Sequence, residues 1–220
     1  KYYAQGDKES MLDLVFKSTK YSFFLCLIVS LPVLIEAPYL IHLWLGQTPE
    51  YTIIFTRLIV IISIVDALAA PIMTAAHATG KIKLYQFVVG MISILNIPIS
   101  YCVLKYVSTN PVTVYVVSLA LAVIAFVVRL WIVKRLVNFS IRQYLRIVVL
   151  KILVLSALSV PLPLGLHLIL ENGFINSAVV IVASVISSCI FIYALGMNYA
   201  ERTVVVNTVR NKIKQYGIGG

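Results

Sequence analysis

The chain of 220 residues is 61% hydrophobic and only 12% charged, with a mean hydropathy of +0.99 and a net charge of +10. A soluble domain of this length needs far more charge to cover its surface, so lipid is the predicted solvent. The positive charge does not indicate nucleic-acid binding, because the basic residues sit in short clusters between long apolar runs rather than on one face.

Six apolar segments are long enough to span about 30 Å of hydrocarbon as helices, which satisfy their own backbone hydrogen bonds. The predicted spans are Tyr21–Trp44, Thr52–Ala76, Leu84–Leu104, Val112–Val133, Ile147–Ile169 and Ser177–Met197. The sequence therefore predicts an all-α fold, a polytopic bundle of transmembrane helices.

Lysine and arginine set the expected orientation of these spans. Alternate connections carry nearly all of the basic residues, and the opposite set of loops holds only Lys105. Because basic loops stay on the cytoplasmic side, both ends of the chain are expected there.

Two segments near the basic connections are amphipathic, Asp7–Lys20 and Ser140–Lys151. Each is either a helix lying in the membrane interface or an extension of the following span. Asp7 is placed to cap the first helix, and Asp13 with Lys17 forms an i,i+4 pair. The expected organisation is an interfacial helix over 1–20, four spans over 21–136, two further spans over 137–200 and a basic tail over 201–220.

The sequence shows none of the motifs that usually mark a catalytic, phosphate-binding or metal site. It contains no nucleophile motif, phosphate-binding loop or metal-ligand spacing, and its three histidines are far apart. We therefore expect no enzyme activity, no cofactor and no metal.

Charged residues inside the predicted spans are more informative, because charge in lipid is costly and faces a cavity or a partner. Arg57 and Asp66 lie nine residues apart in the second span, which is roughly 13 Å along a helix and on opposite faces. They are candidates for a substrate path through a water-filled cavity. The alternatives are a structural ion pair with another helix and, for Arg57, simple exposure at the membrane interface. Glu36, between Pro32 and Pro38, is either a further path residue or a carboxylate rising to the outer interface.

Prolines recur within or at the ends of the spans, where each one frees a carbonyl and can kink its helix. Kinked helices are common in transporters, although other membrane proteins also contain them. Asn96, close to Pro98, is predicted to be either a substrate contact or a hydrogen-bonding link between helices.

Four stretches of the sequence are distinctive: Lys1-Tyr2-Tyr3-Ala4-Gln5-Gly6-Asp7, Leu43-Trp44-Leu45-Gly46 with Pro49-Glu50-Tyr51, Ala70-Pro71-Ile72, and Ala78-Thr79-Gly80-Lys81-Ile82-Lys83-Leu84-Tyr85-Gln86. They resemble the polysaccharide flippases of the O-antigen or capsule type, in the multidrug/oligosaccharidyl-lipid/polysaccharide exporter superfamily. The resemblance covers most of the chain and is strongest from Lys1 to Tyr101.

The resemblance implies the C-terminal portion of a protein with twelve to fourteen spans in two lobes, whose N-terminal lobe would be its partner. Such proteins move an undecaprenyl-diphosphate-linked oligosaccharide across the bacterial inner membrane, and a cationic cavity for the diphosphate would suit Arg57. In the turn, Gly80 is expected to end a helix in the left-handed conformation. Lys81 and Lys83 are expected to contact the anionic cytoplasmic leaflet, or to act as a topology signal alone.

The leading hypothesis is therefore a lipid-linked oligosaccharide flippase that works by alternating access, with membrane lipids and the lipid-linked oligosaccharide as its ligands. One alternative is a cation-coupled drug exporter, in which Asp66 binds H⁺ or Na⁺. An alternative of another class is a membrane glycan polymerase, ligase or acyltransferase, which the short outer loops disfavour.

Overall fold

The computed structural model describes residues 7–80, 82–138, 140–171, 173–199, 201–203 and 207. Its helices are α1 (Lys8–Leu45), α2 (Thr52–Ala78), α3 (Ile82–Tyr106), α4 (Val112–Val137), α5 (Ile141–Tyr144), η2 (Leu145–Val149), α6 (Leu150–Ser159), α7 (Pro161–Ile169), α8 (Phe174–Phe191) and η3 (Ile192–Gly196). No strand occurs within these residues. In the described part of the chain, six helical segments are long and apolar enough to cross a membrane, with 141–169 and 174–196 each counting as one segment. The chain is thus an all-α bundle of a multi-pass membrane protein.

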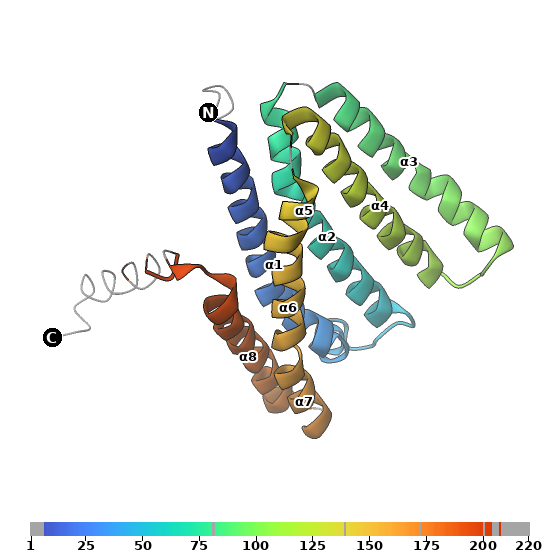
Figure 1. The fold of residues 1–220 in the computed structure, drawn as a ribbon. Coiled ribbons are helices and arrows are strands. Elements are labelled where there is room, and N and C mark those ends of the chain that lie inside the picture. The colour runs from blue at the N-terminus through green and yellow to red at the C-terminus, as the bar shows by residue number, and fades with distance from the viewer. Residues whose placement is uncertain are drawn as a thin grey trace.

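Helix α1 is the centre of this bundle. It packs against α2 on one side and against α8, with α6 and α7, on the other. Beyond α2 come α4 and then α3, whose main neighbour is α4 (Figure 1). The start of α1, the α2–α3 connection and the end of α4 lie together at one end of the bundle (Figure 1). We call this the basic end, because the basic connections gather there.

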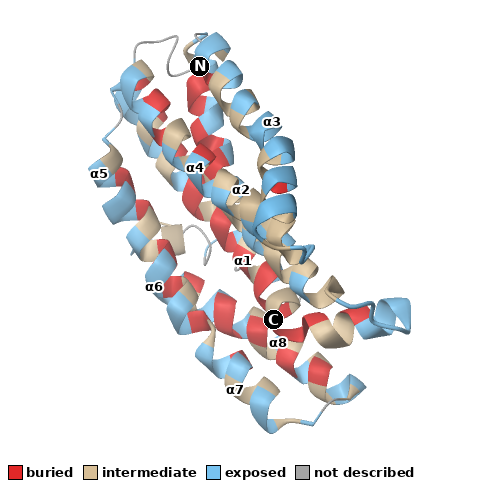
Figure 2. Ribbon diagram, turned by 90° about the vertical axis from the view of Figure 1, so that its right-hand side faces the viewer, coloured by how far each residue is buried: buried red, intermediate tan, exposed pale blue. Residues whose placement is uncertain are grey.

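The buried core follows α1 along its length. Figure 2 shows buried residues on successive turns of α1, whereas α3 is mostly exposed. Phe23, Phe24 and Leu27 of α1 belong to a cluster that extends to Val133 of α4 and Leu155 of α6. This apolar cluster joins the helices on both sides of α1.

The ends of the first two helices match the sequence prediction. The Ser10 N–H donates to Asp7 Oδ1 at 3.0 Å, which caps α1. Gly80, after α2, adopts φ +71°, the left-handed conformation. Helix α1 runs without interruption from Lys8 into the first span, so its amphipathic start is an extension of that span.

The prolines inside α1 accompany a kink, whereas those inside α2 and α3 do not interrupt the helix. In α1, which contains Pro32 and Pro38, Glu36 has φ −92° and ψ 18°, so the helix is kinked there. Helices α2 and α3 continue through Pro71 and Pro98. Pro161 begins α7, because proline at the first helical position loses no intrahelical hydrogen bond.

Gly196, the last residue of η3, provides a test of this packing. A Cβ there would lie 2.6 Å from Phe24 Cζ and 3.2 Å from Leu155 Cδ1. We expect Gly196→Ala to lower stability by about 1–3 kcal/mol, since overpacking displaces a buried ring. Gly90→Ala in α3 is the matched control, because nothing lies within 4 Å of its Cβ position. Thermal unfolding in detergent micelles measures both; equal melting temperatures would contradict the packing.

Candidate functional site

Arg57 of α2 contacts the kinked segment of α1. Its Nε donates to the Leu34 carbonyl at 3.0 Å and its Nη2 donates to the Ile35 carbonyl at 3.5 Å. Pro38 has no N–H to offer the carbonyl four residues before it, which is that of Leu34. Because a bare carbonyl in lipid is costly, the guanidinium stabilises the kink by replacing the missing donor.

Glu36 lies at the same kink, and its side chain is buried. Its side chain is only 3% exposed, and its Oε1 lies 2.7 Å from Nδ1 of His167 on α7. A buried carboxylate needs such a partner. The pair fastens α7 to α1, and the two roles predicted for Glu36 stay predictions.

Asp66 lies near the middle of α2 and pairs with Arg129 of α4. Arg129 Nη1 is 3.7 Å from Asp66 Oδ1. The two side chains differ in exposure: Arg129 is 18% exposed and Asp66 is 60% exposed. The interhelical pair therefore exists, yet most of the Asp66 side chain remains uncovered by the described residues.

Asp66 belongs to a row of exposed residues on α2, which we call the α2 polar stripe. It comprises Ser63, Asp66, Ala70, Thr74 and His77, and its members share one face of the helix at spacings of three or four residues. The Ser63 and Thr74 hydroxyls donate to the Ile59 and Ala70 carbonyls, so lipid would tolerate them. The Asp66 carboxylate has no hydrogen to donate to a carbonyl of its own helix, so it is the residue of the stripe that lipid would tolerate least.

Asn96 joins α3 to α4. Its Nδ2 donates to Ser118 Oγ at 3.0 Å, and Ser100 Oγ donates to its Oδ1 at 3.1 Å. Of the two roles predicted for Asn96, the structure shows the hydrogen-bonding link between helices.

The lysines of the α2–α3 turn are only partly described. Lys83 is exposed on the first turn of α3 at the basic end. Lys81 lies outside the described residues. The contact predicted for Lys83 with a charged leaflet is compatible with this exposure and stays a prediction.

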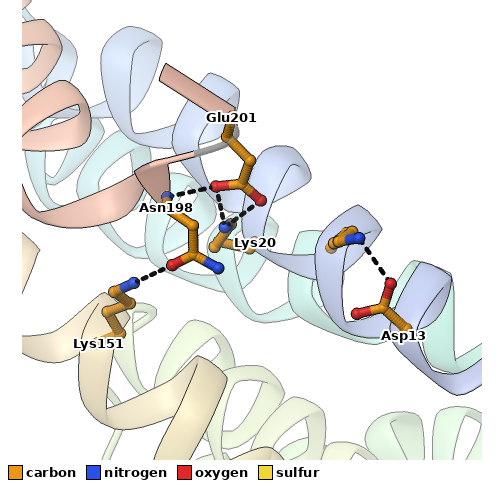
Figure 3. Close-up of polar contacts among 6 residues, drawn as sticks. Asp13, Lys20, Lys151, Asn198 and Glu201 are labelled. Carbon is orange, nitrogen blue, oxygen red and sulfur yellow. Dashed lines mark hydrogen bonds and ion pairs between the residues drawn. The ribbon is translucent and has the colours of Figure 1, made fainter. Parts of the chain in front are cut away.

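A polar cluster joins α1 to the segment after α8 (Figure 3). Lys20 Nζ donates to both carboxylate oxygens of Glu201 at 2.7 Å. The Asn198 N–H donates to Glu201 Oε2 at 2.7 Å, and Lys151 Nζ donates to Asn198 Oδ1 at 3.4 Å. Beside this cluster, between α1 and η2, lies a cavity of about 610 Å³.

The environment of Glu201 keeps it ionised. Desolvation raises the pKa of the Glu201 carboxyl, but the hydrogen bonds from Lys20 and from the Asn198 N–H together outweigh this, so its pKa lies below the usual value. The neighbouring pair Asp13–Lys17, at 2.6 Å, is predicted by the sequence spacing and is largely exposed. It contributes little to stability.

The structure thus distributes the predicted site residues over separate places rather than one site. Arg57 and Glu36 meet at the α1 kink, Asp66 lies on the α2 polar stripe, and Asn96 lies between α3 and α4. The partners that the sequence reasoning missed are Arg129, His167 and Glu201. Arg129 and His167 could have been identified from the sequence, because each lies at a similar depth in its span to the acidic residue with which it pairs.

Comparison with known protein families, characterised proteins and solved structures finds no match for this chain. We therefore infer a function from the geometry described above and from the resemblance of the quoted stretches.

The Glu36–His167 pair makes a direct prediction about stability. His167→Ala leaves the Glu36 carboxylate buried without its partner, and we expect a loss of about 1–3 kcal/mol. Adding Glu36→Gln to His167→Ala removes the buried charge and should recover part of the loss. His42→Ala is the control, because His42 is exposed near the end of α1 and its loss should change stability by less than about 0.5 kcal/mol. Thermal unfolding measures all three; a loss no greater for His167→Ala than for His42→Ala would contradict the pair.

Proposed function

We propose that the protein translocates an undecaprenyl-diphosphate-linked oligosaccharide across the bacterial inner membrane by alternating access, in the biosynthesis of a surface polysaccharide such as the O-antigen. In this proposal both ends of the chain lie on the cytoplasmic side. The observation that carries it is Asp66, a charged side chain 60% exposed near the middle of a membrane-spanning helix.

A charge inside the hydrocarbon of a membrane is costly. An aspartate at the centre of a spanning helix costs about 2.5–3.5 kcal/mol on insertion scales, so Asp66 must meet water or polar protein groups. The α2 polar stripe continues this surface toward the basic end, through Thr74 and His77. An exposed face that carries Ser63, Asp66, Thr74 and His77 among apolar residues suits an amphiphile whose headgroup crosses the membrane while its chain stays in lipid.

Arg129 gives this surface a guanidinium group that can bind phosphate. Guanidinium groups bind phosphate oxygens with paired hydrogen bonds, and Arg129 is held close to the stripe by Asp66. Its Nε is buried and has no hydrogen-bond partner among the described residues. We propose that a diphosphate competes with Asp66 for Arg129, so that the ion pair opens when the headgroup passes.

The remaining predicted residues support the path indirectly. Arg57 and Glu36 hold the α1 kink to α2 and α7, and Asn96 holds α3 to α4. This arrangement suits rigid groups of helices that rock about a kinked central helix. The helices that face the α2 polar stripe would belong to a partner lobe.

A cation-coupled drug exporter is the second candidate. The exposed Asp66 carboxylate favours it, because a carboxylate at membrane depth is a common site for H⁺ or Na⁺. In that case Arg129 would release Asp66 when the cation binds.

Export of the surface polysaccharide in cells that express the full-length protein tests the proposal. We expect Asp66→Asn and Arg129→Gln each to lower export by about tenfold or more, since ~1.4 kcal/mol at the rate-limiting step suffices for a factor of ten. Asp13→Asn is the matched control, because it makes the same chemical change in an exposed pair on α1. It should leave export unchanged, with equal protein in the membrane.

The exchanged double variant, Asp66→Arg with Arg129→Asp, separates a path role from a structural one. It restores an ion pair between α2 and α4 but moves the cation onto the α2 polar stripe. Failure of this variant to export supports the path; normal export would mean that the pair only holds the helices together. Drug efflux that follows an imposed ion gradient, with normal polysaccharide export in Asp66→Asn, would favour the cation-coupled exporter.

A further inference from the structure

Two arginines lie together at the basic end, on the segment that leads into the fifth span. Arg142 of α5 and Arg146 of η2 line one pocket of about 440 Å³, together with Ser140, Gln143 and Ile147. Being four residues apart, they lie on successive turns of the same face. All five lining residues are exposed, so the pocket is a shallow surface depression, open to a headgroup from the membrane interface.

No acidic residue balances these arginines. The chain contains eight acidic residues, and its sequence has none between Asp66 and Glu171. All eight acidic residues fall in the described parts, and none of them forms an ion pair with Arg142 or Arg146. No carboxylate of these residues occupies either guanidinium group, so both can bind an external anion.

The rest of the pocket fits a phosphate attached to an apolar group. The guanidinium groups present several N–H donors, and the Gln143 side chain adds an amide. Ile147 provides an apolar wall beside them, and the opposite side of the segment is anchored by the buried side chains of Tyr144 and Val148. The backbone at this point is a π-helical turn, Leu145–Val149, a form that is frequent at functional sites.

We propose that this pocket binds the phosphate headgroup of an anionic phospholipid in the leaflet that borders the basic end. The two guanidinium groups hold the phosphate oxygens, and Ile147 contacts the glycerol and the first part of the acyl chains. A zwitterionic lipid also carries a phosphate, but its cationic headgroup is repelled by the paired arginines. The site is separate from the α2 polar stripe and does not depend on the transported cargo.

Native mass spectrometry of the delipidated full-length protein in micelles tests this proposal. Phosphatidylglycerol or phosphatidylcholine is added, and the lipid retained at each concentration gives the affinity. We expect phosphatidylglycerol to bind at least about tenfold more tightly, and Arg142→Gln with Arg146→Gln to abolish that preference. Arg142→Lys with Arg146→Lys keeps the charges and should retain most of it.

The matched control removes two charges at the same end but outside the pocket, by Lys8→Gln with Lys134→Gln. Both lysines are exposed and neither lines the pocket. We expect the control to change phosphatidylglycerol binding by less than about twofold. An equal loss in both double variants would overturn the proposal in favour of diffuse attraction to basic loops.

Two further outcomes bear on the source of the phosphate and on folding. Full displacement of the lipid by inorganic phosphate or pyrophosphate at equal concentration would overturn the assignment to a lipid headgroup. The melting temperature of the double glutamine variant should equal that of the wild type, because both arginines are exposed. A variant that is folded and still prefers phosphatidylglycerol would refute the site.

Discussion

The pairing of the α1 kink with polar side chains from α2 and α7 is the constraint on which the rest of the bundle depends. A kinked helix in lipid exposes carbonyls that no water can reach, and Pro38 guarantees at least one of them. Arg57 satisfies this carbonyl from one side, and His167 satisfies the Glu36 carboxylate from the other. The two groups of helices are therefore joined through the same bend of the central helix.

Asp66 differs from the other intramembrane charges in how little of its side chain is covered by neighbouring helices. Arg57, Glu36 and Arg129 are each largely or partly covered and engaged with a neighbouring helix, as the lipid environment demands. Asp66 is engaged on one side only, and the larger part of its surface stays open. A side chain that violates the rule obeyed by its neighbours is the place where function is expected.

The sequence was sufficient to predict the class of fold, the number of spans, the Asp7 cap and the left-handed Gly80, because hydropathy, capping and glycine are local signals. It identified the costly residues Glu36, Arg57, Asp66 and Asn96 from their depth in lipid. It could not assign their partners, since Glu36 and His167 are 131 positions apart and their contact depends on how α7 folds back against α1. Proline was an ambiguous signal for the same reason: Pro71 and Pro98 lie in continuous helices, whereas α1 is kinked at Glu36 beside Pro38.

We infer that the α2 polar stripe faces water in the assembled protein rather than lipid. A nitroxide spin label at position 70, which is exposed and one turn from Asp66, measures this in the full-length protein in lipid nanodiscs. We predict that a water-soluble nickel chelate relaxes this label more strongly than oxygen does. A label at position 97 on α3, which is 77% exposed and apolar, should show the reverse. Stronger relaxation by oxygen at position 70, or protection from both reagents, would contradict the claim.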